Sequence, residues 1–478
     1  MSAARLVMPA IRWQAGPGFE QERGPIDRAL ELGVGGFIVF GGTREAVARL
    51  TERLEEDAGR SLLISADLER GAGQQVAGLT ELPPPRALAS LGDLGPTRAA
   101  GQLTGAEARS VGINWVLGPV ADLDLEPDNP IVQTRSFGAD PARVAEQVTA
   151  WIGGAHDAGV LTCAKHFPGH GRAAADSHDR LPVVTTSAAE LERTDWVPFR
   201  AAIAAGTDAI MTGHVAFPSL DPSGRAATGS ALILDRLRIW MGFDGLVVTD
   251  AMIMEGFSAA AGAAEASRVA LLAGVDLMLY PPDVAAVVAA LDAAGDDAAG
   301  ADRLAESLRR YDRALARATT MAVGRPLDRA VAGEIARRLV MAGAEPMALK
   351  EPFELIVADD DQDGAYPPSP NSYLEDALRA AGLALGAGGS RLLLAFAEPR
   401  ASKGRAGFGP RCRSIFADPA TRADAAVLFG HPRLRPELPA GIPVIQAWHR
   451  QRLMQDAVAE WLVAGGVTEV EAKPPRGN

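Results

Sequence analysis

The sequence predicts a parallel (β/α)₈ TIM barrel over residues 1–320, a helical connector at 321–350 and a smaller αβα sandwich domain at 351–478. Three observations lead to this fold class. Short apolar runs alternate with amphipathic helical patterns, ionisable residues follow the ends of these runs, and a second, shorter alternation begins near residue 351. At 478 residues the chain is also too long for one core of ordinary size, so two domains are expected.

Eight apolar runs of the first domain have the length and continuity of strands that are buried on both faces. These runs are 5–12, 35–40, 61–66, 113–120, 160–165, 208–213, 245–249 and 274–279. Helical patterns are expected at 44–57, 97–110, 141–158, 188–205, 232–241, 260–273 and, as a closing helix, 302–318. Eight strands separated by helices match a barrel, with an open doubly wound sheet as the alternative on this pattern alone.

The residues that follow the strands favour the barrel over the open sheet. Ionisable side chains come after five of the predicted strands, namely Asp67 and Glu69, Asp122 and Asp124, Lys165 and His166, His214, and Asp250. A barrel builds its active site from the carboxyl ends of many strands, whereas an open sheet concentrates its site at one switch point.

The second domain is predicted to be a further αβ segment without a catalytic constellation. Its strands are expected at 353–358, 391–396, 425–430 and 443–447, with helices near 372–382 and 450–464. The glycine-rich stretch 386–391 precedes a strand instead of joining a strand to a helix, which is the wrong order for dinucleotide binding. His431 and His449 are expected to be structural.

Composition excludes several classes of partner. The net charge of −13 argues against nucleic acid or an anionic membrane surface, and no window approaches 18 uncharged apolar residues. Cys163 and Cys412 are too few and too far apart for a disulfide framework, and the first ten residues lack the apolar core of a signal peptide. We therefore expect a cytoplasmic protein with a small-molecule partner, and the oligomeric state stays open.

Ionisable groups are concentrated in residues 160–178. An apolar run ends in the Lys-His pair 165–166, and the following loop closes with Asp-Ser-His at 176–178. A carboxylate two residues from an imidazole can orient it and stabilise its protonated form, which gives a general acid/base near neutral pH. Asp250, at the end of another strand, suits a nucleophile or base, with a helix cap or structural ion pair as the alternative.

Other chemistries fit the sequence less well. His166 and His170 are four residues apart, but Pro168 and Gly169 between them disfavour the helix that would align two metal ligands. Residues 69–75 lack the Gly-Lys-Ser/Thr ending of a phosphate loop, and the chain has no Gly-x-Ser-x-Gly motif. We expect neither a metal nor another cofactor. A carboxylate and an acid with separate roles at one barrel mouth instead fit double-displacement glycoside chemistry.

At this point several motifs carry a resemblance. The stretch Lys165-His-Phe-Pro-Gly-His-Gly, with Asp176-Ser-His and Leu181-Pro, resembles the signature of glycoside hydrolase family 3 β-N-acetylglucosaminidases of the bacterial peptidoglycan-recycling type. Supporting matches follow in the family's order: Asp67-Leu-Glu, Arg135-Ser-Phe-Gly, Asp140-Pro, Met211-Thr-Gly-His-Val and Thr249-Asp250. The family's β-glucosidases lack the Asp-Ser-His loop, which favours the N-acetylhexosamine branch. The second domain resembles the αβα domain of longer members.

The resemblance implies a role for each matching residue. Asp250 would be the nucleophile, and His178, paired with Asp176, would be the acid/base. The substrate-binding residues implied are Asp67, Arg135, Lys165 and His166 for the sugar hydroxyls, and His214 and Met211 for the pocket wall.

The chain departs from the family pattern in three places. The usual Asp-x-Glu-Gly-Gly-Arg-Val is replaced from Asp67 onward, so the arginine expected in the stretch Arg70–Gln75 has no clear equivalent. The usual Asp-Thr after Gly171 is Arg172-Ala173, and the residue after the nucleophile, often acidic, is Ala251. These departures bear on fine specificity and on how the loop folds over the substrate.

The implied function is a retaining, exo-acting β-N-acetylglucosaminidase (β-hexosaminidase) that hydrolyses terminal N-acetylglucosamine from wall-derived or chitin-derived saccharides through a covalent glycosyl-enzyme. A neutral imidazole repels a phosphate dianion less than a carboxylate would, so a phosphorylase is one alternative. A β-glucosidase is a second alternative, and a non-catalytic sugar-binding protein is the alternative from another class. In each case the partner is a small carbohydrate.

Overall fold

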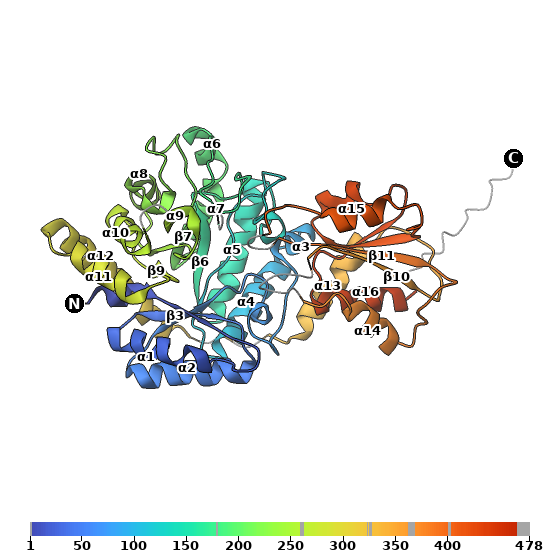
Figure 1. Cartoon of the computed structure of the whole chain (residues 1–478), viewed down its shortest axis with the longest axis horizontal. Coiled ribbons are helices and arrows are strands. Elements are labelled where there is room, and N and C mark those ends of the chain that lie inside the picture. The colour runs from blue at the N-terminus through green and yellow to red at the C-terminus, as the bar shows by residue number, and fades with distance from the viewer. Residues whose placement is uncertain are drawn as a thin grey trace. The chain divides into compact units, whose positions relative to one another are not determined.

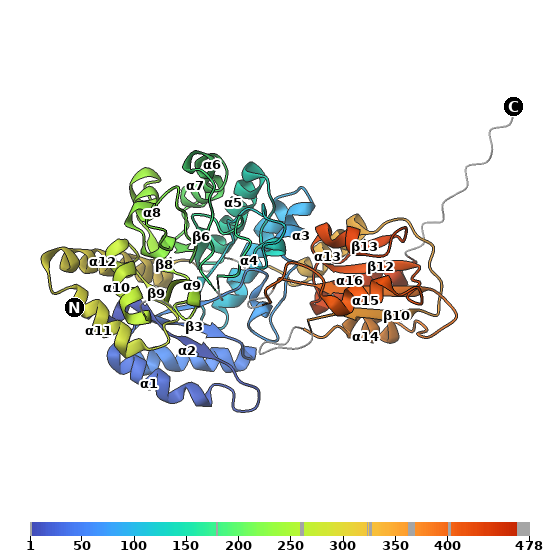
Figure 2. The ribbon, with the colours of Figure 1, turned by 45° about the horizontal axis from the view of Figure 1, so that its top comes forward.

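The computed structural model describes residues 2–177, 180–258, 262–322, 324, 327–361, 369–399 and 403–465, without the side chains of residues 255 and 258. The chain divides into two compact units, which are drawn in Figures 1 and 2. The first comprises residues 1–331 with 399–404, and the second comprises residues 332–398 with 405–478.

The first unit is a closed ring of parallel strands, which confirms the predicted barrel. A seven-stranded sheet runs in the order β2 to β8, and β1 pairs with β9. A bridge from Val248 to Leu277 joins β8 to β9, and β1 continues into β2 past Pro9, which has no N–H to donate. The strands are β1 (Val7–Met8), β2 (Ala10–Arg12), β3 (Gly36–Phe40), β4 (Leu63–Ala66), β5 (Trp115–Val116), β6 (Leu161–Phe167), β7 (Ala209–Thr212), β8 (Leu246–Thr249) and β9 (Met278–Leu279).

Helices lie around the outside of this ring (Figures 1 and 2). They are α1 (Arg23–Leu32), α2 (Arg44–Ala58), α3 (Pro85–Ser90), α4 (Gly95–Arg109), α5 (Pro141–Asp157), α6 (Ala188–Arg193), α7 (Trp196–Ala204), α8 (Ala231–Asp235), α9 (Glu255–Ser258), α10 (Ala263–Ala273), α11 (Val284–Ala294) and α12 (Ala298–Thr320). Across the described ranges, no helix combines the length and apolarity needed to cross a membrane.

Two predicted helices differ in detail from the structure. The pattern at 188–205 forms two helices, α6 and α7, because the backbone leaves the helical region at Thr194. The pattern at 232–241 begins as α8 and ends as a π-helix over Arg236–Trp240. Both changes lie in helices on the outside of the ring.

The second unit has one parallel four-stranded sheet in the order β10 to β13. Helix α15 covers one face, and α13, α14 and α16 lie on the other (Figure 1). Buried charges follow the strand ends: Arg450 is fully buried and contacts Asp359 and Glu398. The elements are α13 (Ala330–Gly343), β10 (Glu354–Asp359), α14 (Tyr373–Ala380), β11 (Arg391–Ala397), α15 (Pro410–Ala417), β12 (Ala425–Gly430), β13 (Val444–Gln446) and α16 (Arg452–Val463).

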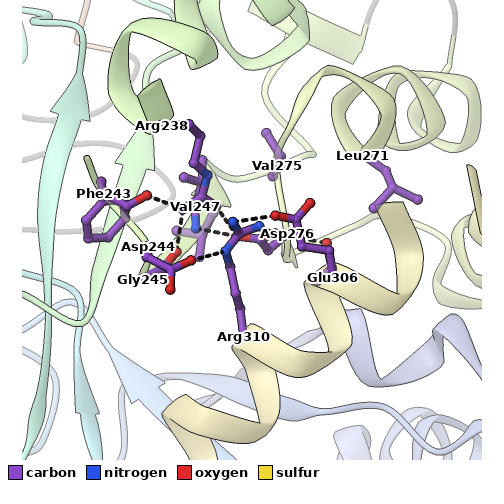
Figure 3. A network of polar contacts seen from close by, with 12 residues as sticks. Arg238, Phe243, Asp244, Gly245, Val247, Leu271, Val275, Asp276, Glu306 and Arg310 are labelled. Carbon is purple, nitrogen blue, oxygen red and sulfur yellow. Dashed lines mark hydrogen bonds and ion pairs between the residues drawn. The ribbon is translucent and has the colours of Figure 1, made fainter. Parts of the chain in front are cut away.

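A buried ionic network closes the amino-terminal end of the barrel (Figure 3). Asp276, which is 0% exposed and precedes β9, accepts from the backbone N–H of Val247 at 2.9 Å. Its partners are the guanidinium groups of Arg238, Arg303 and Arg310 and the hydroxyl of Ser307. Burial raises the pKa of Asp276, but the three arginines outweigh it and lower the pKa from its ordinary value. The network ties α12 to the strands that close the ring.

Candidate active site

The predicted site residues lie at the carboxyl ends of neighbouring strands. The sheet register pairs Lys165 with Met211, and Met211 with Val248, two residues before Asp250. Paired residues of adjacent strands point to the same face, and the side-chain period of two continues from Val248 to Asp250. The backbone N–H of Asp250 donates to the carbonyl of Thr212 at 3.2 Å. The structure thus places Lys165, Met211 and Asp250 on one face.

Lys165 is the centre of an ionic network at this end of the barrel. Its side chain is 2% exposed, and Nζ lies 2.6 Å from Oδ1 of Asp67 and 2.7 Å from Oε1 of Glu69. Burial lowers the pKa of Lys165, but the two carboxylates outweigh this effect and raise the pKa above its ordinary value. Lys165 is therefore a fixed cation at neutral pH.

Glu69 joins the predicted sugar-binding residues, although it was not among them. It accepts two hydrogen bonds from Arg135, both at 2.8 Å, in the fork geometry that holds a guanidinium in one plane. Burial raises the pKa of Glu69, but Arg135 and Lys165 hold it well below its usual range. The Asp-x-Glu motif after the third strand was the signal that could have identified this residue.

Asp122 plays a similar part for His166. The carboxylate, which is 0% exposed, lies 2.7 Å from Nδ1 of His166 and also accepts from the backbone N–H of His170 at 2.6 Å. Burial raises the pKa of Asp122, but His166 outweighs it and lowers the pKa from its ordinary value. Because the Asp122 carboxylate accepts hydrogen bonds, the proton of His166 on this side belongs on Nδ1. The peptide bond between Lys165 and His166 is cis.

The loop that contains Asp176 packs against the segment after Asp250. Asp176 and Ser177 are 5% and 1% exposed, and the Ser177 carbonyl accepts from the N–H of Gly256 at 3.3 Å. The Ser177 hydroxyl lies 3.0 Å from Nε2 of His170. His178, the predicted acid/base, lies outside the described residues.

His214 lies beside the predicted nucleophile. Its Nδ1 is 2.8 Å from the Thr228 hydroxyl, and its Nε2 is 3.3 Å from the carbonyl of Ala251, the residue after Asp250. The ring stacks on Phe257 with centroids 5.2 Å apart. One oxygen of Asp250 accepts from the N–H of Ala251 at 2.7 Å. Together these contacts bring the predicted residues from the third to the seventh strand to one end of the barrel.

Most of the first unit matches a known protein family. The family model "Glycosyl hydrolase family 3 N terminal domain" matches residues 25–314, which is more than half of the chain. The chain belongs to glycosyl hydrolase family 3. This membership confirms the resemblance that the motifs indicated.

Named relatives of this family 3 protein include two curated enzymes. A β-N-acetylglucosaminidase/β-glucosidase of Cellulomonas fimi is 38% identical over 259 residues, which cover 52% of this chain and 46% of that protein. A β-hexosaminidase of Thiobacillus denitrificans is 37% identical over 274 residues, which cover 54% of this chain and 75% of that protein. The match therefore spans less than half of the first relative and three quarters of the second.

A solved structure covers both units. The glycoside hydrolase family 3 β-N-acetylglucosaminidase of Paenibacillus sp. str. FPU-7 superposes with a TM-score of 0.82 at 26% identity. The superposition covers 97% of this chain and 96% of that one.

The family 3 site departs from the usual motif at Arg172, and the structure shows what this residue does. Its Nε lies 2.9 Å from Asp195, which is buried, and its guanidinium also pairs with Glu190 at 3.0 Å. Ala173, beside it, is fully buried. The replacement of Asp-Thr by Arg-Ala thus anchors the start of the loop to the junction of α6 and α7.

The structure also gives the contacts of the other departures from the family 3 motif. Arg70 is 3.9 Å from Glu81, at the outer limit of an ion pair, and Gln75 accepts from the N–H of Gly41 at 3.1 Å. Ala251 contributes its carbonyl to His214. Among the described residues, no group of three or more His, Cys, Asp or Glu side chains is arranged to hold a metal.

Proposed function

We propose that this protein is a retaining, exo-acting β-N-acetylglucosaminidase that releases terminal N-acetylglucosamine from small saccharides. The observation that carries the proposal is the hydrogen bond from Gly256 to Ser177, because it joins the two halves of the site. Gly256 follows Asp250 by six residues, and Ser177 lies between Asp176 and His178. The proposed nucleophile and the proposed acid/base thus come from segments that touch. The names of the curated relatives support the substrate class.

In the first step, Asp250 attacks the anomeric carbon and forms a carbon–oxygen bond as the glycosidic bond breaks. His178, oriented by Asp176, gives its proton to the departing oxygen. In the second step, His178 takes a proton from water, whose oxygen attacks the same carbon and releases the Asp250 carboxylate. Two inversions give net retention.

The sugar ring is proposed to lie on Asp67, Lys165, His166 and Arg135. Asp67 and Arg135 have 29% and 28% of their side chains exposed, so these two groups reach the solvent, while their partners Lys165 and Glu69 stay buried. A carboxylate and a guanidinium held in this way can exchange hydration water for sugar hydroxyls with little reorganisation. His214 and Met211 would form the wall next to the anomeric carbon.

The proposal is tested by turnover of an aryl β-N-acetylglucosaminide. Asp250→Ala should reduce kcat by at least about 10⁴-fold, because no covalent intermediate can form. His178→Ala should lose less on an activated aryl leaving group than on a sugar leaving group. An Asp250→Ala variant with near-wild-type turnover would exclude the assignment.

The substrate and the acceptor are tested with matched aryl β-glycosides that differ only at carbon 2, with and without phosphate. We expect the 2-acetamido compound to be preferred and water to be the acceptor. Preference for the 2-hydroxyl compound would make the protein a β-glucosidase, and accumulation of a sugar 1-phosphate would make it a phosphorylase.

We further propose that the saccharides come from cell-wall turnover and that the protein acts in the cytoplasm. Cys163 and Cys412 are free and buried, and thiols of this kind are typical of a reducing compartment. Fractionation of cells that produce the protein should recover its activity with cytoplasmic markers, and recovery outside the cytoplasm would contradict this location.

A further inference from the structure

One histidine of the site motif has no role in the proposed mechanism. His170 is 1% exposed, and its backbone is held on both sides. Its N–H donates to Asp122 at 2.6 Å, and its carbonyl accepts from Asn129 at 3.0 Å. Asp122 also contacts His166, so the same carboxylate fixes both histidines. The backbone of His170 is therefore held by the same carboxylate that contacts His166.

Among the described residues, the ring of His170 makes one hydrogen bond, and its partner is Ser177. Nε2 lies 3.0 Å from the Ser177 hydroxyl, whereas Nδ1 is buried without a hydrogen-bond partner among the described residues. A buried N–H without an acceptor is rarer in proteins than an acceptor without a donor. The proton therefore belongs on Nε2, and His170 donates to Ser177.

A second hydrogen bond, independent of His170, also fixes Ser177. Its carbonyl accepts from the N–H of Gly256, and a Cβ added at Gly256 would lie 2.7 Å from that carbonyl oxygen. The close approach explains why glycine stands at this position. The hydrogen bond from His170 thus links Ser177 to the proposed sugar-binding residues. The hydrogen bond from Gly256 links Ser177 to the segment that follows Asp250.

We infer that His170 is a positioning residue: through Ser177 it fixes the backbone between Asp176 and His178 relative to the sugar-binding residues and to Asp250. This inference rests on the proposed function, since it assigns the contact to proton donation. His170 neither touches the substrate nor exchanges a proton. It acts by fixing Ser177, which lies between the two members of the proposed acid/base pair in the sequence.

The test compares variants that break the contact with variants that keep it. Ser177→Ala and His170→Leu remove the acceptor and the donor, whereas Ser177→Thr keeps the hydroxyl and His170→Gln keeps an N–H near the position of Nε2. The substrates are β-N-acetylglucosaminides with dinitrophenol, which leaves without an acid, and with a sugar, which needs one. The measured quantity is kcat/KM, which reports the glycosylation step for both.

We expect the two breaking variants to lose about 10- to 100-fold on the sugar leaving group and less than about threefold on dinitrophenol. Ser177→Thr and His170→Gln, which keep the contact, should have kcat/KM values within about threefold of the wild type on both substrates. Equal losses on both leaving groups would overturn the inference, because they would show a purely structural role. Unchanged values for Ser177→Ala would overturn it as well.

Gly256→Ala tests the contact between Gly256 and the Ser177 carbonyl without changing His170 or Ser177. We expect it to show the same selective loss on the sugar leaving group, and an unchanged ratio of the two kcat/KM values would contradict the inference. If His170→Leu fails to fold, Ser177→Ala decides the question, because it removes the other partner of the same hydrogen bond. Ser219→Ala is the matched control, because Ser219 is an exposed loop serine whose hydroxyl donates to the carbonyl of Thr186. If the wild type turned over neither substrate, the proposed function itself would fail, which is a separate result.

Discussion

The barrel carries a buried ionic network at each end, and the two are built in opposite ways. At the amino-terminal end one carboxylate, Asp276, is surrounded by three arginines that are 10–13% exposed. At the carboxyl-terminal end one ammonium group, Lys165, is surrounded by two carboxylates. In the first network Asp276 and its three arginines are largely buried, whereas in the second Asp67 and Arg135 remain more than a quarter exposed.

This difference separates an ionic network that stabilises the fold from one that can bind a ligand. The carboxylate oxygens of Asp276 accept hydrogen bonds from four side chains and one backbone N–H. All five of these donors belong to the protein itself. At the other end the buried members hold Asp67 and Arg135 in place while these two face the solvent. Both networks have low-dielectric surroundings, in which an unpaired charge is costly. Four predictions test the contrast.

The largest effect is expected for Asp276→Asn. Loss of the central charge leaves three arginines without their shared partner and should lower the free energy of unfolding by about 3–5 kcal/mol. Denaturant unfolding of the full chain measures this change. Because the site lies at the other end of the barrel, kcat/KM should stay within about twofold of the wild type, and a large loss of activity in the folded variant would contradict the separation.

A pH-dependent effect is expected at the carboxyl-terminal end. Burial, with a further contribution from His166, lowers the pKa of His170 to about 4. The unfolded chain protonates this imidazole near pH 6.5, so the contribution of the neutral ring to stability is full above that pH. It should be lost as the pH falls from about 6.5 to about 4, by on the order of 3 kcal/mol.

His170→Gln removes this titration and is the matched variant for the measurement. The unfolding free energies of wild type and variant should converge or cross as the pH falls from 7 to 4.5. Parallel curves would show that His170 does not titrate in this range. Asp276 provides the contrast: its lowered pKa contributes stability above the unfolded value near 4, which is lost only as the pH falls below it.

The next effect in size is expected for Glu69→Gln, and it concerns the rate of catalysis. The amide keeps the volume but loses the charge that holds Arg135 and Lys165, so these two proposed sugar-binding groups should shift. A displacement of this kind costs about 100-fold in kcat/KM, or about 2.7 kcal/mol of transition-state binding. Steady-state kinetics on an aryl β-N-acetylglucosaminide measure it, and wild-type kinetics would show that Glu69 does not position the site.

The smallest effect is expected for Arg172→Ala. Arg172 is one-fifth exposed and pairs with Asp195, which keeps a hydrogen bond from Thr194 after the change. We expect a loss of about 1 kcal/mol in unfolding free energy. Thermal unfolding of Arg172→Ala and Arg172→Lys measures this change. The lysine variant keeps a charge near Asp195 and should lose less unfolding free energy. Equal losses in the two variants would show that the charge is not what anchors the loop.

The residues alone were sufficient to place the strands and most of the groups that carry chemistry. Continuous apolar runs mark strands buried on both faces, and the carboxyl ends of parallel strands meet at one end of a barrel. For that reason Lys165, His166 and Asp250 could be assigned to one site before any contact was known. The motif around residues 165–178 added the family and, through it, the role proposed for each group.

The supporting residues could not be assigned in this way, because their partners are far away in the sequence. Glu69 contacts Arg135 across 66 positions, Asp122 contacts His166 across 44, and Gly256, in helix α9, contacts Ser177. A lone carboxylate after a strand has the same local pattern whether it binds a sugar or holds another side chain. Only the folded barrel decides between the two, since it alone determines which charges are buried together and which face the solvent.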